Sequence, residues 1–358
     1  MTSPIVSVVM SVFNGGRFLS EAVESVLSQS FDEFEFIIID DGSDDESLAL
    51  LDRYRSQDSR IRLFAQSNRG LVESLNRGCD LARGRYIARM DADDVALLDR
   101  LKVQVEFLES HPEISLVGGA VEFIDADGKA LLTARHPESD FSIKRQLSDC
   151  TAFWHPTVLY TKDAFLFAGG YRNIPDAEDY DLWLRMADHF ELANLKQVVL
   201  RYRVHPEQGS VLRCRKQALG TLAAKASAAA RRSGACDPLA LSPEITAAAL
   251  ASMGVDDRSI HTAIGRAYLS SARNMYRLRA FSLALAMLAT LQSADCERAD
   301  GWVIADSYLY SGRIYWSQGR YFRGLMQFVV AIFRRPILVG RPLHAAVKSL
   351  GAAFSDAF

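Results

Sequence analysis

The first hundred residues alternate four times between short apolar, β-branched runs and segments with helical periodicity. Such runs are typical of parallel strands that are buried on both faces. The alternation predicts an α/β fold, a mixed and mainly parallel sheet flanked by helices. The predicted strands are 5–11, 34–39, 61–64 and 85–90. The predicted helices are 18–27, 48–54 and 71–82, and Gly84 is expected to cap the last of them.

The order is looser in the next hundred residues, and the chemistry of the chain changes near Arg213. Strand patterns end there, and alanine-rich helical patterns follow. We therefore predict an α/β domain over residues 1–212 and an all-α region over 213–358. Within the first domain, further strands are expected at 116–124, 153–160 and 198–204, and a helix at 179–187.

Composition excludes several classes of protein. A net charge of −3 argues against a nucleic-acid partner. The five cysteines include no C-x-x-C pair, so neither a zinc knuckle nor a disulfide framework is expected, and a reducing compartment is favoured. The sequence has neither a signal-peptide pattern nor an apolar run of membrane-spanning length, which predicts a cytoplasmic location.

Polar residues follow three of the predicted strands, at the end where parallel sheets bind ligands. They are the segment 11–14, the pair Asp40-Asp41, and Asp91-Ala92-Asp93-Asp94. Asp91 and Asp93 are one residue apart, so their carboxylates point the same way and repel unless a cation lies between them. Turn formation and helix capping are the alternative explanations for both acidic segments. An EF-hand is excluded because Ala96 and Lys102 occupy the sixth and twelfth positions of the loop.

Two further polar signals lie later in the first domain. Glu178 and Asp179 begin a predicted helix, where an acid either complements the helix dipole or, facing a crevice, serves as a general base. His205 follows the last predicted strand; a single histidine is usually structural, and the position at a strand end adds weight to a ligand role.

Five motifs occur in a characteristic order: VSVVMSVFNGGRFLSEAVESVLSQSF, FIIIDDGSDDES, GRYIARMDADDVALLDRL, AEDYDLWLR and YRVHPEQGS. With them, residues 5–101 and 150–205 resemble the catalytic domain of family 2 glycosyltransferases. The resemblance implies the GT-A nucleotide-diphospho-sugar transferase fold. It also implies inverting transfer of a sugar from a nucleotide-diphosphate donor, with uridine favoured by family habit. The acceptor would be a hydroxyl of a carbohydrate or lipid-linked molecule, as in cell-surface polysaccharide biosynthesis.

The resemblance also implies roles for single residues. Asp41 would accept the imide N–H of the base, and Phe13 would stack on its ring. Asp91 and Asp93 match the family's D-x-D motif for Mn²⁺ or Mg²⁺, with Asp93 the more direct ligand, and Asp179 matches the catalytic base. The full donor-binding set is Ser11, Phe13, Asn14, Asp41, Arg69 and Asp91; His205 is a further metal or diphosphate contact; and Trp154, His155 and Glu178 are assigned to the acceptor side.

Two other functions stay open. A catalytically inactive copy would bind a nucleotide sugar or act as a scaffold through its helical tail, although such a copy would be expected to have lost Asp93 or Asp179. A nucleotidyltransferase would carry a glycine-rich phosphate loop after the first strand, and residues 12–17 match that loop poorly.

The C-terminal segment is basic. Residues 312–358 carry Arg313, Arg320, Arg323, Arg334, Arg335, Arg341 and Lys348 against the single acid Asp356, with aromatic and aliphatic residues between them. A basic amphipathic helix of this kind can lie on an anionic membrane surface, which predicts peripheral contact at the inner face of the membrane. The alternative is a helix packed on its own domain with a solvated basic face.

Overall fold

The computed structural model describes residues 3–174, 176–205, 213–241, 245–293 and 298–335. The first four strands of the chain form the parallel part of the sheet, in the order β3-β2-β1-β4. The strands are β1 (Val6–Val12), β2 (Phe34–Asp40), β3 (Ile61–Ala65) and β4 (Tyr86–Met90), joined by α1 (Leu19–Leu27), α2 (Ser47–Gln57) and α3 (Leu71–Leu81). The four predicted strands and three predicted helices are confirmed.

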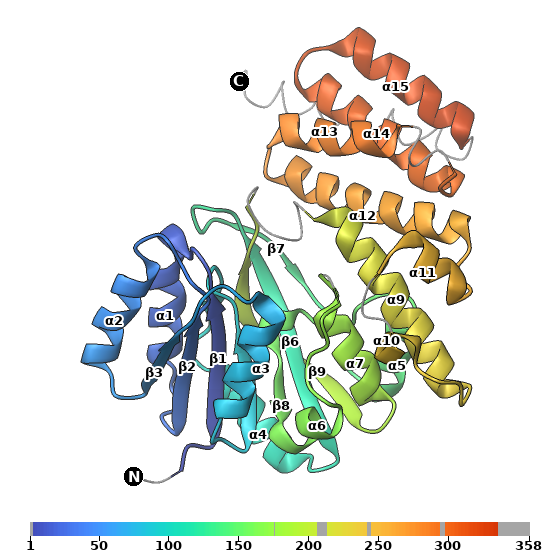
Figure 1. Cartoon of the computed structure of the whole chain (residues 1–358). Helices are drawn as coiled ribbons and strands as arrows, with labels where there is room; N and C mark the ends of the chain where they lie inside the picture. The colour runs from blue at the N-terminus through green and yellow to red at the C-terminus, as the bar shows by residue number, and fades with distance from the viewer. Residues whose placement is uncertain (1–2, 175, 206–212, 242–244, 294–297, 336–358) are drawn as a thin grey trace. The chain divides into compact units, whose positions relative to one another are not determined.

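Helices cover both faces of this half (Figure 1). Val8 and Met10 of β1 belong to one core cluster with Ala22 and Val23 of α1. The residue between them, Val9, points to α3, where a Cβ added to Gly78 would lie 2.5 Å from its Cγ1. Strand residues alternate between faces, so β1 needs apolar partners on both sides.

The second half of the sheet is mixed. It contains β5 (Val95–Ala96), β6 (Ile114–Ile124), β7 (Ala130–Ala134), β8 (Leu159–Thr161) and β9 (Glu191–Arg203). β6 and β9 pair in parallel, whereas β8 joins β4 and β6 in antiparallel fashion and β7 forms an antiparallel edge on β6. The flanking helices are α4 (Arg100–Ser110), α5 (Asp140–Leu147), α6 (Lys162–Phe167) and α7 (Glu178–Ala187).

Three local predictions were wrong. The strand expected at 153–160 is a 3₁₀ turn, η2 (His155–Thr157), followed by the short β8, because Pro156 cannot donate to a ladder. The final strand begins at Glu191 instead of 198. Gly84 does not cap α3, because that helix ends at Ala82 in an extended conformation. A Cβ on Gly84 would lie 2.6 Å from the backbone nitrogen of Ser7, so glycine is needed here to let the backbone of residue 84 approach that of β1.

The chain divides into two compact units, Met1–Val204 with Ala228–Ala235, and His205–Ser227 with Cys236–Phe358. The boundary predicted at 213 stays a prediction. The second unit is helical throughout its described residues, as predicted. Its elements are α9 (Cys214–Arg232, shared with the first unit), α10 (Pro238–Leu241), α11 (Ala247–Ser252), α12 (Asp257–Arg277), α13 (Phe281–Leu291), α14 (Gly301–Ser317) and α15 (Tyr321–Arg334). Within the described residues, every helix is too short or too polar to cross a bilayer.

Candidate active site

The register of the parallel strands brings their polar carboxyl ends to one edge of the sheet. Met10 of β1 lies opposite Met90 of β4, and Val12 lies opposite Asp40 of β2. The segments that begin at Ser11, Asp41 and Asp91 therefore leave the sheet side by side, as the sequence predicts.

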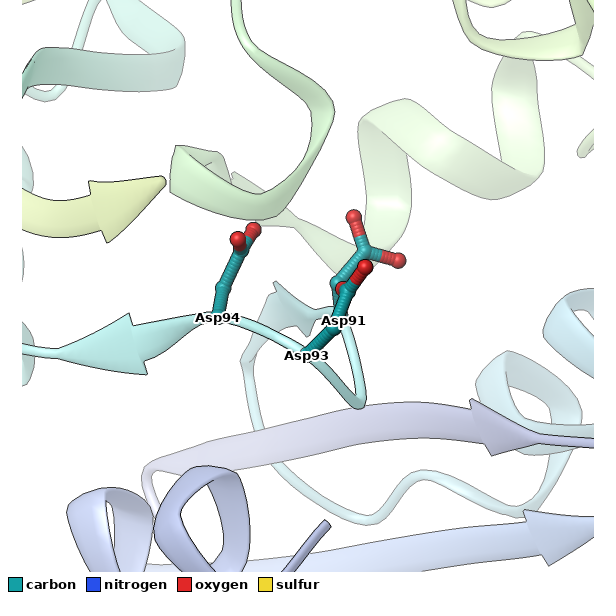
Figure 2. A group of neighbouring side chains, drawn as sticks. All are labelled: Asp91, Asp93 and Asp94. Carbon is teal, nitrogen blue, oxygen red and sulfur yellow. The ribbon is translucent and has the colours of Figure 1, made fainter. Parts of the chain in front are cut away.

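Three carboxylates gather in the loop after β4. Oxygen atoms of Asp91, Asp93 and Asp94 lie within 4.8 Å of one another, and the side chains point to the same side of the loop (Figure 2). Asp94, which the sequence did not single out, is buried; its Oδ1 accepts a hydrogen bond of 2.7 Å from the backbone N–H of Arg203. Its Oδ2 is buried without a partner among the described residues.

Arg89, a buried residue of β4, supplies positive charge beneath this cluster. Its guanidinium forms an ion pair with Asp91. Burial acts to lower the pKa of Arg89, but the charge and hydrogen bond of Asp91, with the charges of Tyr171 and Asp94, together outweigh it and the pKa is raised. Arg89 therefore stays charged, and it offsets one of the three carboxylates.

The remaining negative charge matches a divalent cation. Burial raises the pKa of Asp91, although Arg89 opposes the shift, and burial with the charges of Asp93 and Asp91 raises the pKa of Asp94 well above its usual range. These carboxylates thus ionise reluctantly unless a further cation is present. An all-oxygen donor set with an unpartnered buried oxygen fits Mg²⁺ or Mn²⁺.

Asp41 organises the loop that follows β3. Its Oδ1 accepts hydrogen bonds from Gln66 Nε2 at 2.7 Å and from the backbone N–H of Arg69 at 2.9 Å, and its Oδ2 accepts from the backbone N–H of Gly70 at 2.8 Å. The Arg69 side chain is exposed and lies 3.9 Å from Glu73. The Asp41 carboxylate therefore contacts the backbone of Arg69 and not its side chain. The contacts that both residues are predicted to make with a donor stay predictions.

The loop after β1 presents an aromatic ring to solvent. The Phe13 side chain is 53% exposed. Asn14 adopts a positive φ of 51°, and its Oδ1 accepts from the backbone N–H of Asp44 at 3.0 Å, while its own N–H donates to Ser43 Oγ. The turn after β2 thus holds this loop in place. The exposed ring of Phe13 offers a face on which a nucleotide base could stack.

Asp179 lies in the first turn of α7, within electrostatic reach of the acidic cluster. Burial raises its pKa to about 6, Arg89 opposes that shift, and the negative charge of Asp91 adds to it. Burial, reinforced by the charge of Asp179, raises the pKa of the adjacent Glu178 to about 8. Both carboxyls therefore hold a proton more readily than free ones, and Glu178 does so more than Asp179.

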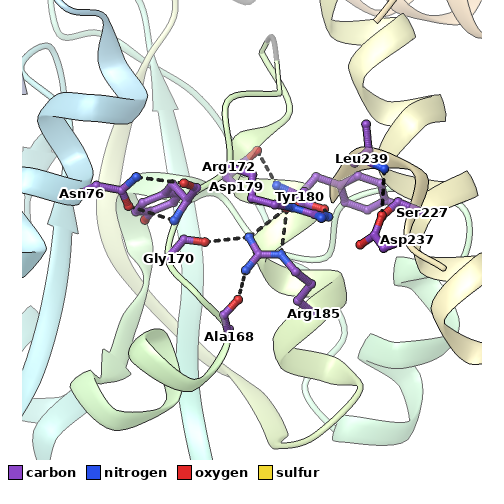
Figure 3. A network of polar contacts seen from close by, with 12 residues as sticks. Asn76, Ala168, Gly170, Arg172, Asp179, Tyr180, Arg185, Ser227, Asp237 and Leu239 are labelled. Atoms are coloured by element: carbon purple, nitrogen blue, oxygen red, sulfur yellow. Dashed lines mark hydrogen bonds and ion pairs between the residues drawn. The ribbon is translucent and has the colours of Figure 1, made fainter. Parts of the chain in front are cut away.

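A buried ionic network fixes the loop that leads into α7 (Figure 3). Asp181 pairs with both Arg172 and Arg185. Arg185 also donates to the carbonyl oxygens of Ala168 and Gly170, the latter at 2.7 Å. These bonds set the start of the helix that carries Asp179.

His155 also contacts the start of α7. Its Nε2 hydrogen-bonds the Tyr171 hydroxyl at 2.9 Å, and its Nδ1 lies 4.0 Å from a Glu178 oxygen. Burial, with a contribution from Arg89, lowers the pKa of His155 well below its usual range, so the ring is neutral at physiological pH.

Trp154 packs against His136, with ring centroids 3.9 Å apart, and edge-on against Phe123 at 6.2 Å. It is half-buried by these contacts. The acceptor-side roles predicted for Trp154, His155 and Glu178 are not tested by this geometry.

Comparison with known proteins identifies the family. The model of the family described as Glycosyl transferase family 2 matches residues 7–166. The chain is 36% identical over 210 residues to EpsE of Bacillus subtilis, which covers 56% of this chain and 74% of the relative. The chain belongs to glycosyltransferase family 2. It is also 31% identical over 205 residues to the O-antigen biosynthesis glycosyltransferase WbnJ of Escherichia coli, covering 56% of this chain and 80% of WbnJ.

Solved structures confirm the GT-A-like fold of this family 2 chain. The mannosyltransferase PcManGT from Pyrobaculum calidifontis aligns with a TM-score of 0.52 and 18% identity, over 98% of this chain and 88% of PcManGT. Residues 1–349 of TarS from S. aureus, in complex with UDP-GlcNAc, align with a TM-score of 0.51 and 16% identity, over 85% of this chain and 91% of that fragment.

Two arginines of this glycosyltransferase escaped the sequence analysis. Arg89 and Arg203 are both buried in strands; Arg89 pairs with Asp91, two residues further along the chain, whereas the partners of the Arg203 side chain come from distant segments. The signal was present, since a charged residue inside an apolar strand must be paired if it is buried. His205 is buried two residues after β9 ends, and its predicted metal or diphosphate contact stays a prediction.

Proposed function

We propose that this chain is an inverting, metal-dependent glycosyltransferase that moves a sugar from a nucleoside-diphosphate donor to an acceptor hydroxyl. The observation that carries the proposal is the acidic cluster after β4, with Asp179 within electrostatic reach of it. PcManGT in complex with GDP-Man and Mn²⁺, and TarS in complex with UDP-GlcNAc, support a nucleotide-sugar donor.

In this proposal the donor lies along the carboxyl edge of the parallel strands. Phe13 stacks on the base, and Asp41 accepts its N–H while holding the loop of residues 66–70 in place. Ser11, Asn14 and Arg69 complete the pocket. Asp91, Asp93 and Asp94 would hold Mn²⁺ or Mg²⁺, with His205 as a further contact. When bound, such an ion neutralises charge that develops on the diphosphate leaving group.

Asp179 acts as the general base. It removes the proton of the acceptor hydroxyl as the oxygen attacks the anomeric carbon from the face opposite the diphosphate, which inverts that centre. A positioned base of this kind contributes about a hundred- to ten-thousand-fold to the rate. Glu178, His155 and Trp154 are assigned to the acceptor side.

The substrates are proposed at the level of class. Uridine is the favoured base, and the acceptor is a carbohydrate or lipid-linked molecule in cell-surface polysaccharide biosynthesis. WbnJ, the relative named for O-antigen biosynthesis, supports that setting. We place the enzyme in the cytoplasm, with peripheral contact at the inner face of the membrane through its basic C-terminal helices; Arg341 and Lys348 of that segment lie outside the described residues.

A thermal-shift screen against UDP- and GDP-sugars, with and without Mn²⁺, tests the proposal, because a ligand of the native state raises its stability by mass action. We expect one donor to stabilise the wild type only with Mn²⁺ and to leave Asp93→Asn unchanged. Asp32→Asn is the control, since that carboxylate is 90% exposed and precedes β2 at the opposite edge of the sheet.

A turnover assay with the donor that the screen identifies separates this proposal from an inactive binding module. Donor binding followed by release of nucleoside diphosphate in the presence of acceptor identifies a transferase. Donor binding without turnover against a panel of acceptors would favour the binding module, and Mn²⁺-independent binding that survives Asp93→Asn would remove the metal role.

A further inference from the structure

One face of α15 exposes a continuous set of large apolar side chains. Phe322 and Phe333 are 76% and 85% exposed. A soluble monomer rarely leaves such a patch uncovered, and a patch of this kind usually marks a binding surface. The set, called the α15 apolar face below, is Tyr321, Phe322, Leu325, Met326, Val329 and Phe333.

The opposite face of α15 already has a partner. Phe328 and Ala331 are buried with Ala305 and Leu309 of α14. The contact is close, since a Cβ added to Gly312 would lie 2.4 Å from Cε1 of Phe328. The α15 apolar face is therefore not needed to hold the helix in place.

Helical geometry gathers the six side chains on one sector. At 100° per residue, positions 321, 322, 325, 326, 329 and 333 fall within about 140° of the helix circumference. Arg323 and Arg334 lie about 60–80° beyond one border of that sector, and Arg320 and Arg335 flank the ends of the helix. The exposed surface of α15 is thus amphipathic, apolar in one sector and basic beside it.

α15 and the segment that precedes it carry charged side chains of one sign. Residues 307–335, all of them described, include five arginines and no aspartate or glutamate. A two-fold contact between copies of this face would place arginines near arginines with no acid to balance them. Aromatic rings with a basic border are instead the pattern of a helix that lies in a membrane interface.

The length of α15 supports the same partner. Its 14 residues span about 21 Å along the helix axis, too short to cross a bilayer core of about 30 Å. A helix of this length can lie in the plane of the interface instead.

We propose that the α15 apolar face binds the surface of an anionic lipid bilayer. The apolar sector enters the boundary between headgroups and acyl chains, and Arg323 and Arg334 contact lipid phosphates. This deepens the membrane contact proposed above. It makes no use of the catalytic residues, so it can fail while the transferase proposal stands.

Vesicle co-sedimentation of the full chain tests this binding. We compare vesicles of phosphatidylcholine alone with vesicles that also contain phosphatidylglycerol. We expect binding to the anionic vesicles, at least about tenfold weaker for Phe322→Ser/Phe333→Ser. Arg323→Gln/Arg334→Gln should lose the preference for anionic lipid. Phe141→Ser is the matched control, because Phe141 of α5 is 77% exposed in the other unit, and it should bind as the wild type does.

The melting temperature and the turnover of each variant serve as controls for the vesicle assay. The variants should melt at the temperature of the wild type and keep their turnover of a soluble acceptor. Equal vesicle binding by the wild type and Phe322→Ser/Phe333→Ser would overturn the proposal, and so would wild-type protein that stays in the supernatant. A lipid-free dimer that the same double substitution dissociates, with no vesicle binding, would assign the face to a second copy of the chain instead.

Discussion

The backbone N–H of Arg203 donates to Oδ1 of Asp94 at 2.7 Å, which joins the last strand of the sheet to the acidic loop after β4. The side chain of Arg203 is buried and continues the connection. Its Nε donates to the carbonyl oxygen of Asp93 at 2.8 Å, and its Nη1 reaches the carbonyl oxygens of Asp125 and Ala126 at 3.2 and 3.3 Å. One guanidinium thus fixes the backbone that positions the acids proposed to bind the metal.

Replacing Arg203 should therefore loosen the acidic loop without removing a ligand. Lysine keeps the charge but cannot reproduce the guanidinium fork. We expect Arg203→Lys to lower the free energy of unfolding by about 2–4 kcal/mol, because buried charged hydrogen bonds are lost. Donor-dependent Mn²⁺ affinity should fall as well. Thermal unfolding and a Mn²⁺ titration measure the two effects.

Arg201 offers a matched control on the same strand. Its guanidinium is half exposed and pairs with Glu122 at 2.9 Å. Such surface pairs contribute at most about 1 kcal/mol, so Arg201→Lys should leave both stability and Mn²⁺ affinity nearly unchanged. If Arg203→Lys lowers stability but leaves the Mn²⁺ affinity intact, the arginine is structural and does not position the acids.

The rate of transfer should depend on the ionisation of Asp179. A general base acts in its deprotonated form, and the pKa of Asp179 is raised to about 6. We expect kcat/KM to fall as the pH drops below about 6, and Asp179→Asn to lower turnover by about a hundredfold or more while donor binding persists. A pH profile of the wild type and a donor titration of the variant check both points.

The same carboxylate should reduce stability at neutral pH. Its pKa rises from 3.8 to about 6 on folding, so the folded state favours the protonated form. The stability that this group contributes is complete below pH 4 and is lost as the pH rises through 6. Asp179→Asn should therefore exceed the wild type in stability at pH 8, by up to about 3 kcal/mol. Melting curves of the wild type and Asp179→Asn at pH 4 and pH 8 test the sign of this effect. A stability difference between the two proteins that is the same at both pH values would contradict it.

Asp41 should act on donor affinity more than on the chemical step. Its two oxygens hold the backbone of Arg69 and Gly70, next to the proposed base pocket. Asp41→Asn loses one acceptor oxygen, and we expect KM for the donor to rise about tenfold, the equivalent of one hydrogen bond. Steady-state kinetics with Asp44→Asn as the control separate KM from kcat. A fall in kcat at constant KM would place Asp41 in the chemical step.

The parallel half of the sheet could be predicted because each strand is a self-contained apolar run. β1 and β2 need no knowledge of their partners to be recognised. β5 has two residues, and β9 pairs with β6 through several shifts of register, so both depend on contacts that local patterns do not encode.

The candidate site divides in the same way. Asp91 and Asp93 follow a predictable strand end; their meeting follows from their one-residue spacing, and their place in the site follows from the binding of ligands at the carboxyl ends of parallel strands. Arg89 and Arg203 lie inside strands, where the sequence shows only an isolated positive charge. Their importance depends on which carboxylates and carbonyls surround them. Arg89 pairs with the nearby Asp91, but the groups around Arg203 come from segments distant in the sequence, such as α1 and the loop after β6.

Substitutions at Gly84 test whether this glycine is a helix cap or a point of close backbone contact. As a helix cap it would need a positive φ, which Asn tolerates better than Ala. The structure instead places a Cβ at this position 2.6 Å from the nitrogen of Ser7 and 2.7 Å from the carbonyl carbon of Val6. Any side chain must therefore push the segment between α3 and β4 away from β1, and we expect Gly84→Ala to cost about 1–3 kcal/mol and Gly84→Asn at least as much.

Gly301 is the control for that substitution, because a Cβ added there meets no atom within 4 Å. Gly301→Ala should leave the stability unchanged or raise it slightly, since alanine reduces the freedom of the unfolded chain. Chemical denaturation of the three variants measures the differences. A smaller loss for Gly84→Asn than for Gly84→Ala would restore the cap interpretation, because only a left-handed backbone prefers asparagine to alanine.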